Sequence, residues 1–357
     1  MVQQTDIIYL GRSRLHRTRA NLVQLLHTAS GFTRLGFRTS VVLPPWPRRL
    51  SVPSRLAELG VDPCPELHAS QLLHPRWRFW PYVWVHRRAL GKARVIYTRV
   101  AHISLALAHA GLQHHLEIHD VDALTAGGTI DRIIELHRTG LIGYLVPISA
   151  GAAGLLMEAG ADPARIHVAH SGVKLEAYTD LAPFDPGTLV HPRIVHLGRL
   201  SGPRGLEVFR HFAMRGDCDI TVISTDENPI ENVSYHAPIP MSQVPGWYAR
   251  SDLTLLPYQA DIATVATMSP IKMFEAMAAG RPIIASDLPT MREVLKHEDT
   301  ALLVKPDDLN AWDQAYERLR DDPELASRLA CNAQAEAAGY SWDARARGIA
   351  DAIGLSG

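Results

Sequence analysis

The chain has 357 residues, 46% of them hydrophobic and 20% charged, with a formal net charge of −1. This length suggests two domains that each bury their own core, and no apolar run approaches the roughly 20 residues needed to cross a bilayer. Three scattered cysteines fit neither a zinc site nor a disulfide framework, and the N-terminus lacks the pattern of a signal peptide, so we expect a cytoplasmic protein.

Short apolar runs alternate with helical patterns from one end of the chain to the other. In the first half we predict strands at residues 7–10, 39–43, 95–97, 116–119, 144–148 and 166–169, and helices at 17–35, 79–90, 103–110 and 151–159. In the second half we predict strands at 194–197, 220–224, 253–257, 282–286 and 301–304, and helices at 205–214, 242–249, 271–279, 290–295 and 309–319. Alternation of this kind predicts an α/β protein with parallel sheets covered by helices on both faces.

The run from Leu181 to Arg193 is rich in Pro and Gly and has no hydrophobic period, which is typical of a linker. We therefore predict a first domain over residues 1–185, a second over 186–340 and a final helix over 341–357. Two such domains are expected to bind a ligand in the cleft between them, at the carboxyl ends of their strands.

A glycine loop opens the second domain, with Gly198, Gly202 and Gly205 between a predicted strand and a predicted helix. Such a loop lets the backbone approach a phosphate, and Arg199 and Arg204 can bind that phosphate through their guanidinium groups. The spacing matches neither the dinucleotide fingerprint nor the P-loop. An ordinary strand-to-helix turn with solvated arginines remains the alternative.

A second motif starts at Ser269-Pro270-Ile271, where a proline in the first turn opens a helix that closes at Gly280. The start of a helix attracts phosphate through its free N–H groups and its dipole. Glu275 lies one turn further along, where a carboxylate can hold a pair of hydroxyls. Together these features suit a nucleotide-sugar.

The two motifs occur here as G-R-L-x-x-x-R-G and S-P-I-K-M-F-E-A-M-A-A-G-R-P, with W-Y-A-R-S-D between them and Y-S-W before the last helix. In this combination the chain resembles the retaining glycosyltransferases of the GT-B fold, in the large group of bacterial mannosyl- and glucosyltransferases. The resemblance covers nearly the whole chain. It implies two Rossmann-like domains that face each other across a cleft, with a C-terminal helix that crosses back to the first domain.

The resemblance also implies roles for residues of the second domain. Arg199 and Arg204 would bind the donor diphosphate, with Arg at a position where the family usually has Lys, and Glu275 would hold the nucleotide ribose. The first glutamate of the family's Glu-x7-Glu pair is replaced by Thr267, which leaves open how the donor sugar is held. Lys272 either assists the phosphates or is a solvated helix lysine. The remaining donor-site candidates are Gly198, Ser269, Pro270 and Ile271.

In the first domain the resemblance points to His119, at the end of a predicted strand, as a residue that donates a hydrogen bond to the donor sugar. Gly11 would form a glycine loop below the donor phosphates. Arg99 and Asp120 are candidates for contact with the acceptor, although Arg99 could equally be a surface arginine.

Residues 75–94 contain six Lys and Arg, three Trp and no acidic residue, within a first half (residues 1–185) that has 20 basic and 14 acidic residues. Basic residues interleaved with Trp are typical of a membrane interface. The alternative is a core helix with its tryptophans inward and its arginines in water.

These observations predict an enzyme that transfers a hexose from a nucleoside diphosphate carrier such as UDP or GDP to a glycan or lipid-linked acceptor in polysaccharide biosynthesis. The resemblance implies front-face chemistry with no essential metal or other cofactor. An epimerase or phosphorylase of the same architecture, or a non-catalytic sugar-nucleotide-binding protein, remains open. We expect a cytoplasmic location with peripheral contact to anionic membrane, and no nucleic-acid partner.

Overall fold

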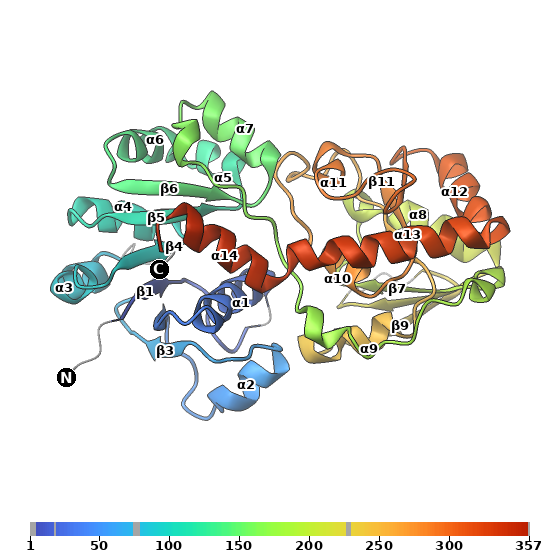
Figure 1. The fold of residues 1–357 in the computed structure, drawn as a ribbon, viewed down its shortest axis with the longest axis horizontal. Helices are drawn as coiled ribbons and strands as arrows, with labels where there is room; N and C mark the ends of the chain where they lie inside the picture. The colour runs from blue at the N-terminus through green and yellow to red at the C-terminus, as the bar shows by residue number, and fades with distance from the viewer. Residues whose placement is uncertain (1–4, 18, 74–78, 226–229, 356–357) are drawn as a thin grey trace. The chain divides into compact units, whose positions relative to one another are not determined.

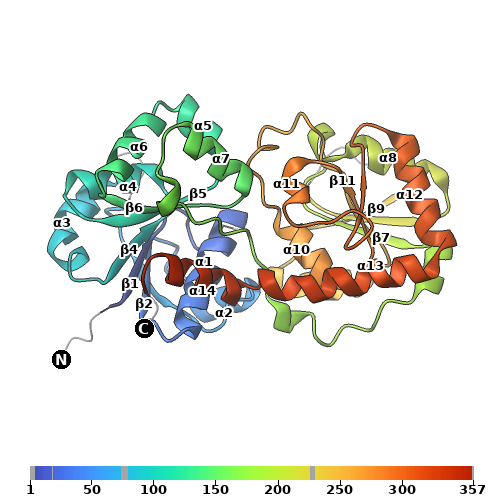
Figure 2. The same cartoon turned by 45° about the horizontal axis from the view of Figure 1, so that its top comes forward.

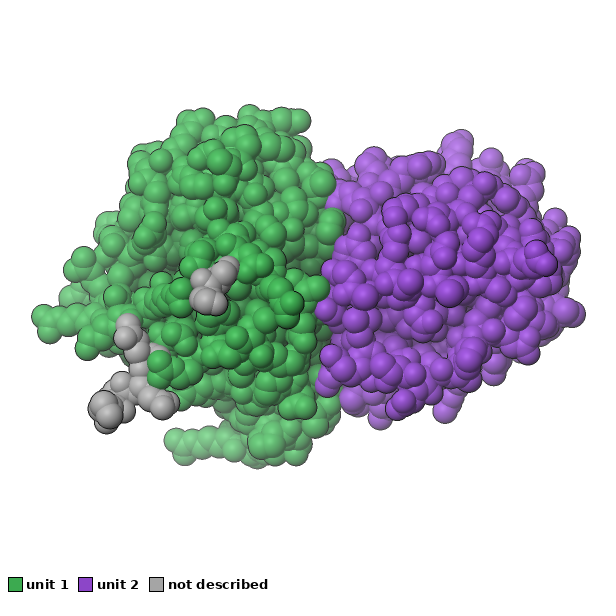
Figure 3. Space-filling view, in the orientation of Figure 1, with its two compact units in different colours: residues 1–172, 342–357 green, residues 173–341 purple. Residues whose placement is uncertain are grey.

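A computed structural model of the chain describes residues 5–17, 19–73, 79–225 and 230–355. The chain folds into two compact units, one formed by residues 1–172 with 342–357 and the other by residues 173–341 (Figure 3). The second unit thus begins at Val173, whereas the domain boundary was predicted at residue 185. The Pro- and Gly-rich run is not the connection, because it contains the short helix η4 (Pro186–Val190), whose Leu189 is buried in the core of the second unit.

Unit 1 has one parallel sheet in the order β3-β2-β1-β4-β5-β6 (Figure 1). Its strands are β1 (Ile7–Leu10), β2 (Thr39–Leu43), β3 (Glu66–Ala69), β4 (Val95–Thr98), β5 (His114–Ile118) and β6 (Ile142–Pro147). Its helices are α1 (Ala20–Arg34), α2 (Val52–Glu58), α3 (Trp80–Leu90), α4 (Ala101–His109), α5 (Val121–Ala126), α6 (Ile130–Arg138), α7 (Ala150–Glu158) and α14 (Trp342–Ala352).

Unit 2 contains two three-stranded parallel sheets, β9-β8-β7 and β10-β11-β12, joined by a bridge between Ile194 and Leu253. The strands are β7 (Arg193–Leu197), β8 (Asp219–Ile223), β9 (Val233–His236), β10 (Thr254–Leu256), β11 (Ile283–Ser286) and β12 (Leu302–Val304). The main helices are α8 (Leu206–Arg215), α9 (Val244–Tyr248), α10 (Ile271–Ala278), α11 (Pro289–Arg292), α12 (Leu309–Asp321) and α13 (Pro323–Glu336). Through the bridge, unit 2 repeats the strand order of unit 1, which is the doubly wound Rossmann order.

Two predictions of strand content were wrong. The predicted strand at 166–169 does not form, since Ile166 makes an isolated bridge to Leu145. Strands β3 and β9 were not predicted because they lie at sheet edges with largely exposed side chains, so neither shows a buried apolar run.

The last helix, α14, belongs to unit 1 and packs along α1, as the two views of the ribbon show (Figures 1 and 2). The His27 and Trp342 rings stack with their centroids 5.3 Å apart. A Cβ atom on Gly31 would lie 2.6 Å from the Cβ of Ala346, so only glycine allows this approach. The predicted return of the C-terminal helix to the first domain is therefore confirmed.

Candidate functional site

The glycine loop of unit 2 follows β7 and is tied to the end of β10. Gly198 and Gly205 adopt φ of +103° and +85°, where glycine is the least strained residue. A Cβ atom on Gly205 would lie 2.2 Å from Cγ of Pro257, the residue that follows β10. The loop therefore lies where the chain order of the sheet reverses between β7 and β10, which is the ligand-binding edge of such sheets.

Lys272, in the first turn of α10, reaches this loop. Its ammonium donates to Nε2 of His196 over 3.3 Å, and a Cβ atom on Gly198 would lie 3.8 Å from its Nζ. Burial, and then the charge of Lys272, lower the pKa of His196 well below its usual value, so the ring is neutral and accepts the hydrogen bond. Lys272 is thus half-buried and held beside the loop, not solvated.

The two arginines of the loop have different surroundings. Arg204 is half-buried, and its charge acts on both His196 and Tyr258. Arg199 is exposed. The structure therefore places Arg204 in one positive cluster with Lys272, while Arg199 extends from the same loop toward solvent.

Glu275 is the buried acid of this cluster, with 6% of its surface exposed. Burial raises the pKa of Glu275 to about 7, and the charge of Lys272 only partly opposes this. No hydrogen bond to its carboxylate comes from the residues that the structure describes. Its charge also acts on Tyr178, Tyr248 and Tyr258, which surround it. An unpaired buried carboxylate of this kind costs stability until a ligand donates to it.

The segment before α10 is more enclosed than its sequence suggests. Thr267 is fully buried, and its hydroxyl has no hydrogen-bond partner in the described part of the chain. Ser269 is 8% exposed, and Pro270 and Ile271 are half-buried. Thr267 is therefore inaccessible in this structure, although the sequence made it a donor-site candidate.

Unit 1 has a pocket of about 290 Å³ at the carboxyl ends of β1, β4 and β5. Arg99, His119 and Asp120 all line it, together with Arg12 and Asn21. The structure thus brings three of the first-domain candidates into one pocket, again at the edge where open α/β sheets bind ligands.

Glu117 is the central residue of a hydrogen-bond and ion-pair network at this pocket. It is 1% exposed and accepts hydrogen bonds from Tyr97 Oη at 3.0 Å and from Nε2 of His119. An ion pair of 2.8 Å joins it to Arg345 on α14. Burial alone would raise the pKa of Glu117, but the charge of Arg345 and then the contact with His119 hold that pKa well below its usual value. Glu117 is therefore a carboxylate at neutral pH.

This network decides the protonation of His119. Burial, and then the charge of Arg99, lower the pKa of His119 to about 4, so the ring is neutral near pH 7. A carboxylate only accepts hydrogen bonds, so the Nε2 proton of His119 is directed to Glu117 and its Nδ1 is an acceptor. His119 therefore offers the pocket a lone pair, not the N–H donor that the sequence suggested.

The other first-domain candidates have clear local roles. Arg99 is not a surface arginine, because its Nη1 donates to the carbonyl of Asn21 at 3.0 Å and to Gln24 at 3.1 Å. Asp120 caps α5 by accepting from the N–H of Ala123 at 2.8 Å. Gly11 is buried, and a Cβ atom there would lie 2.6 Å from Leu25. Its lack of a side chain is thus explained by packing at the end of β1.

Sequence reasoning missed the partners of these residues. The missed partners are distant in sequence from the groups that they contact. They are His196 and Tyr258 in unit 2, and Tyr9, Tyr97 and Arg345 in unit 1. Polar residues at the ends of neighbouring strands could have indicated His196. For Arg345 the sequence has no corresponding signal. Within the described ranges, no three His, Cys, Asp or Glu side chains gather as a candidate metal site.

The chain is similar to known glycosyltransferases. Residues 191–322 match the family model for group 1 glycosyl transferases. The chain is 25% identical over 215 residues to D-inositol 3-phosphate glycosyltransferase 1 of Catenulispora acidiphila, covering 51% of this chain and 50% of that protein. It is 27% identical over 119 residues to the corresponding Thermobispora bispora enzyme, covering 33% of this chain and 26% of that protein. The chain thus spans half or less of these relatives.

Two solved structures share the fold over nearly the whole chain. HepE of Anabaena, in complex with UDP and glucose, has a TM-score of 0.72 at 14% identity and covers 98% of this chain and 99% of its own. Sucrose-phosphate synthase of Thermosynechococcus elongatus has a TM-score of 0.74 at 14% identity, with 98% of both chains covered. The chain therefore has the fold of the GT-B glycosyltransferases, and its residues 191–322 are similar to the group 1 glycosyl transferases.

Proposed function

We propose that this protein is a retaining glycosyltransferase that moves a hexose from a nucleoside diphosphate sugar to a glycan or lipid-linked acceptor without a metal ion. One observation carries the proposal. At the strand-order reversal of unit 2, the charges of Lys272 and Arg204 both act on His196, and the charge of Lys272 also acts on Glu275, a buried carboxylate without a hydrogen-bond partner in the described residues.

The cations and the carboxylate match the two ends of a nucleoside diphosphate. Lys272, Arg204 and the exposed Arg199 provide positive charge for the diphosphate, and the glycine loop allows its oxygens close to the backbone. Glu275 can accept hydrogen bonds from both ribose hydroxyls. Donor binding then satisfies the buried carboxylate that the free protein leaves without a partner.

The same cations have a role in the reaction. When the glycosidic bond to phosphate breaks, negative charge develops on the leaving diphosphate, and fixed positive groups stabilise that charge. Neither carboxylate of the unit 1 pocket suits a covalent mechanism. Glu117 is enclosed by Arg345, His119 and Tyr97, and Asp120 is engaged in capping α5. This disfavours a covalent intermediate on either carboxylate, so the retention that we propose would come from front-face attack without a protein nucleophile.

In this proposal the unit 1 pocket binds sugar hydroxyls. Neutral His119 accepts a hydrogen bond from a sugar hydroxyl through Nδ1, and Arg99 supplies a positive wall. UDP is the first carrier to test, because HepE, which shares this fold, was solved with UDP and glucose.

A thermal-shift panel of UDP-, GDP-, ADP- and TDP-hexoses tests the proposal, followed by calorimetry with the donor that stabilises the protein. Loss of a charge-assisted contact at Glu275 is worth about 1.5–3 kcal/mol, so Glu275→Ala should weaken donor binding about ten- to a hundredfold. Glu207→Ala, which removes an exposed acid of unit 2, is the matched control.

Product analysis separates the possible activities. Slow release of nucleoside diphosphate in the absence of acceptor supports a transferase, whereas sugar isomerisation would indicate an epimerase. Unchanged donor affinity in Glu275→Ala would refute the assignment of the site.

A further inference from the structure

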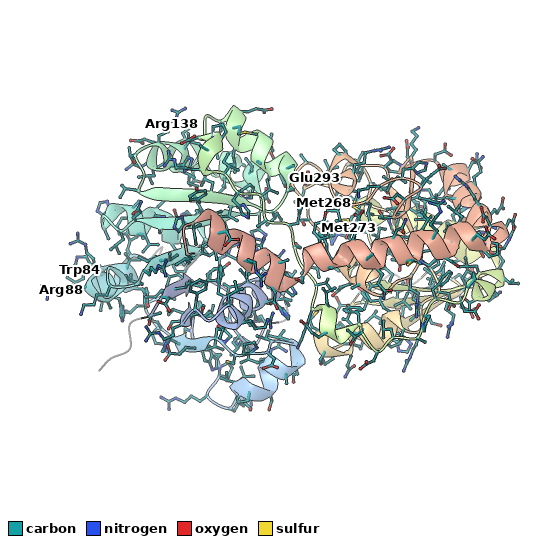
Figure 4. The ribbon with its side chains drawn as sticks, viewed as in Figure 1. Trp84, Arg88, Arg138, Met268, Met273 and Glu293 are labelled. Carbon is teal, nitrogen blue, oxygen red and sulfur yellow. The ribbon has the colours of Figure 1, made fainter. Side chains whose placement is uncertain are left out.

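Helix α3 presents an apolar and basic surface to solvent. Trp84 is 78% exposed and Val85 57% exposed, and Arg87 and Arg88 on the next turn are also exposed. These four residues are called the α3 surface below. Trp84 and Arg88, labelled in Figure 4, lie one helical turn apart on the same face of the helix. The alternative of a core helix with its tryptophans inward is therefore wrong for Trp84.

A groove of about 470 Å³ adjoins this surface, between α3 and the end of α4. Trp80, Trp84 and Val83 form one wall, and His109 to Gly111 form the other. Arg87 lies at the rim of the groove, where its Nε donates a hydrogen bond to the carbonyl of Ala110 at 2.7 Å. The groove thus has aromatic and aliphatic walls with a guanidinium at its edge.

Helix α3 and the chain segments on either side of it contain basic residues but no acidic ones. Between Glu66 and Glu117 the sequence contains no Asp or Glu, so α3 and α4 have no acidic residue of their own. Arg88 has no ion-pair partner among the residues that the structure describes. Of the predicted segment 75–94, residues 75–78 lie outside the described residues. The charge of the described part is therefore not neutralised within its own helices.

We propose that the α3 surface docks this protein on an anionic phospholipid bilayer. Trp side chains favour the boundary between headgroups and acyl chains, and each Lys or Arg near an anionic surface adds further attraction. A short helix that presents both on its solvent face suits a position in the plane of the interface. Association of two copies through this surface is disfavoured, because it would bring two uncompensated basic faces together.

Sedimentation of the full-length protein with lipid vesicles tests this proposal, and its result does not depend on glycosyl transfer. We expect binding to vesicles that include phosphatidylglycerol and much weaker binding to pure phosphatidylcholine. Raising the salt from 0.1 to 1 M shortens the screening length from about 10 to 3 Å and should release the protein.

Point variants locate the contact. Arg88→Ser should weaken partitioning about fivefold, while Arg88→Lys should retain it. Trp84→Ser should weaken it by at least about tenfold. Met214→Ser and Arg132→Ser remove an equally exposed apolar side chain of α8 and an exposed arginine of α6, and both should bind as the wild type does.

Several outcomes would overturn the proposal. These are no binding of the wild type to anionic vesicles, equal binding to neutral vesicles, or equal losses in the control variants. A dimer in solution that Trp84→Ser dissociates would assign the surface to a second copy of the chain instead. Circular dichroism of each variant separates loss of the contact from loss of the fold.

Discussion

Replacing Arg345 by Met tests whether α14 sets the charge state of the unit 1 pocket. Arg345 is 6% exposed and its ion pair with Glu117 is enclosed, so its removal leaves a buried carboxylate without its main countercharge. Breaking a buried ion pair from one side costs about 3–5 kcal/mol. We therefore expect urea unfolding at pH 7.5 to show a loss of that size, whereas Arg132→Met, which breaks an exposed pair, should change stability little.

The dependence of this loss on pH is the more specific part of the prediction. In the wild type the depressed pKa of Glu117 contributes stability that is present above its unfolded pKa of about 4.3 and is lost as the pH falls. Removing Arg345 takes away the largest charge that lowers the pKa of Glu117, so that pKa rises from its depressed position, while His119 and Arg99 still lower it. The folded variant then takes up a proton at a higher pH than the wild type, so its deficit should shrink as the pH falls through the raised pKa.

A double variant tests whether the loss of stability arises from the uncompensated charge of Glu117. Arg345→Met combined with Glu117→Gln removes the charge that Arg345 compensates, so the double variant should recover much of the stability lost by Arg345→Met alone. A deficit that does not change with pH, or a double variant as unstable as the sum of the two single ones, would refute the role assigned to this pair.

Four further predictions concern Glu275, His119 and the role of metal ions. Because the pKa of Glu275 is about 7 in the free protein and the bound ribose needs a carboxylate, donor affinity should fall about tenfold per pH unit below 7, and Glu275→Gln should abolish this dependence in calorimetry. Because burial raises the pKa of Glu275, this side chain destabilises the folded protein once the pH exceeds the pKa of Glu275 in the unfolded chain. Glu275→Gln should therefore stabilise the free protein at pH 8 by up to about 3 kcal/mol in urea unfolding. A destabilised variant would contradict the burial of Glu275 without hydrogen-bond partners in the described residues. His119→Ala should lower kcat while the pH–rate profile between 6 and 8 keeps its shape, because His119 is neutral throughout that range; loss of an inflection near pH 6.5 would show that it titrates there. Turnover should persist in EDTA, and restoration by Mg²⁺ or Mn²⁺ after loss in chelator would count against a purely cationic diphosphate site.

The sequence by itself determined the fold class and indicated the local motifs of the candidate sites. Strand–helix alternation predicts two doubly wound sheets, because a strand buried on both faces is a short apolar run and a covering helix has a period of 3.6 residues. Gly198, Gly205, Arg204, Lys272 and Glu275 were identified because each lies in a local motif whose chemistry depends on neighbours in sequence. The domain boundary was misplaced because η4, with one buried leucine in a Pro- and Gly-rich run, has no period that distinguishes it from a linker.

The tertiary structure alone decided how these residues are charged and which of them are accessible. Arg345 meets Glu117 only because α14 returns to α1, and that contact keeps Glu117 ionised and fixes the proton of His119. Lys272 is paired because β7 brings His196 beside α10. Burial and charge depend on every group within a few ångströms, and most of those groups are distant in sequence. For the same reason a tryptophan-rich amphipathic helix does not reveal whether a given ring points inward, and the exposure of Trp84 is known only from the folded chain.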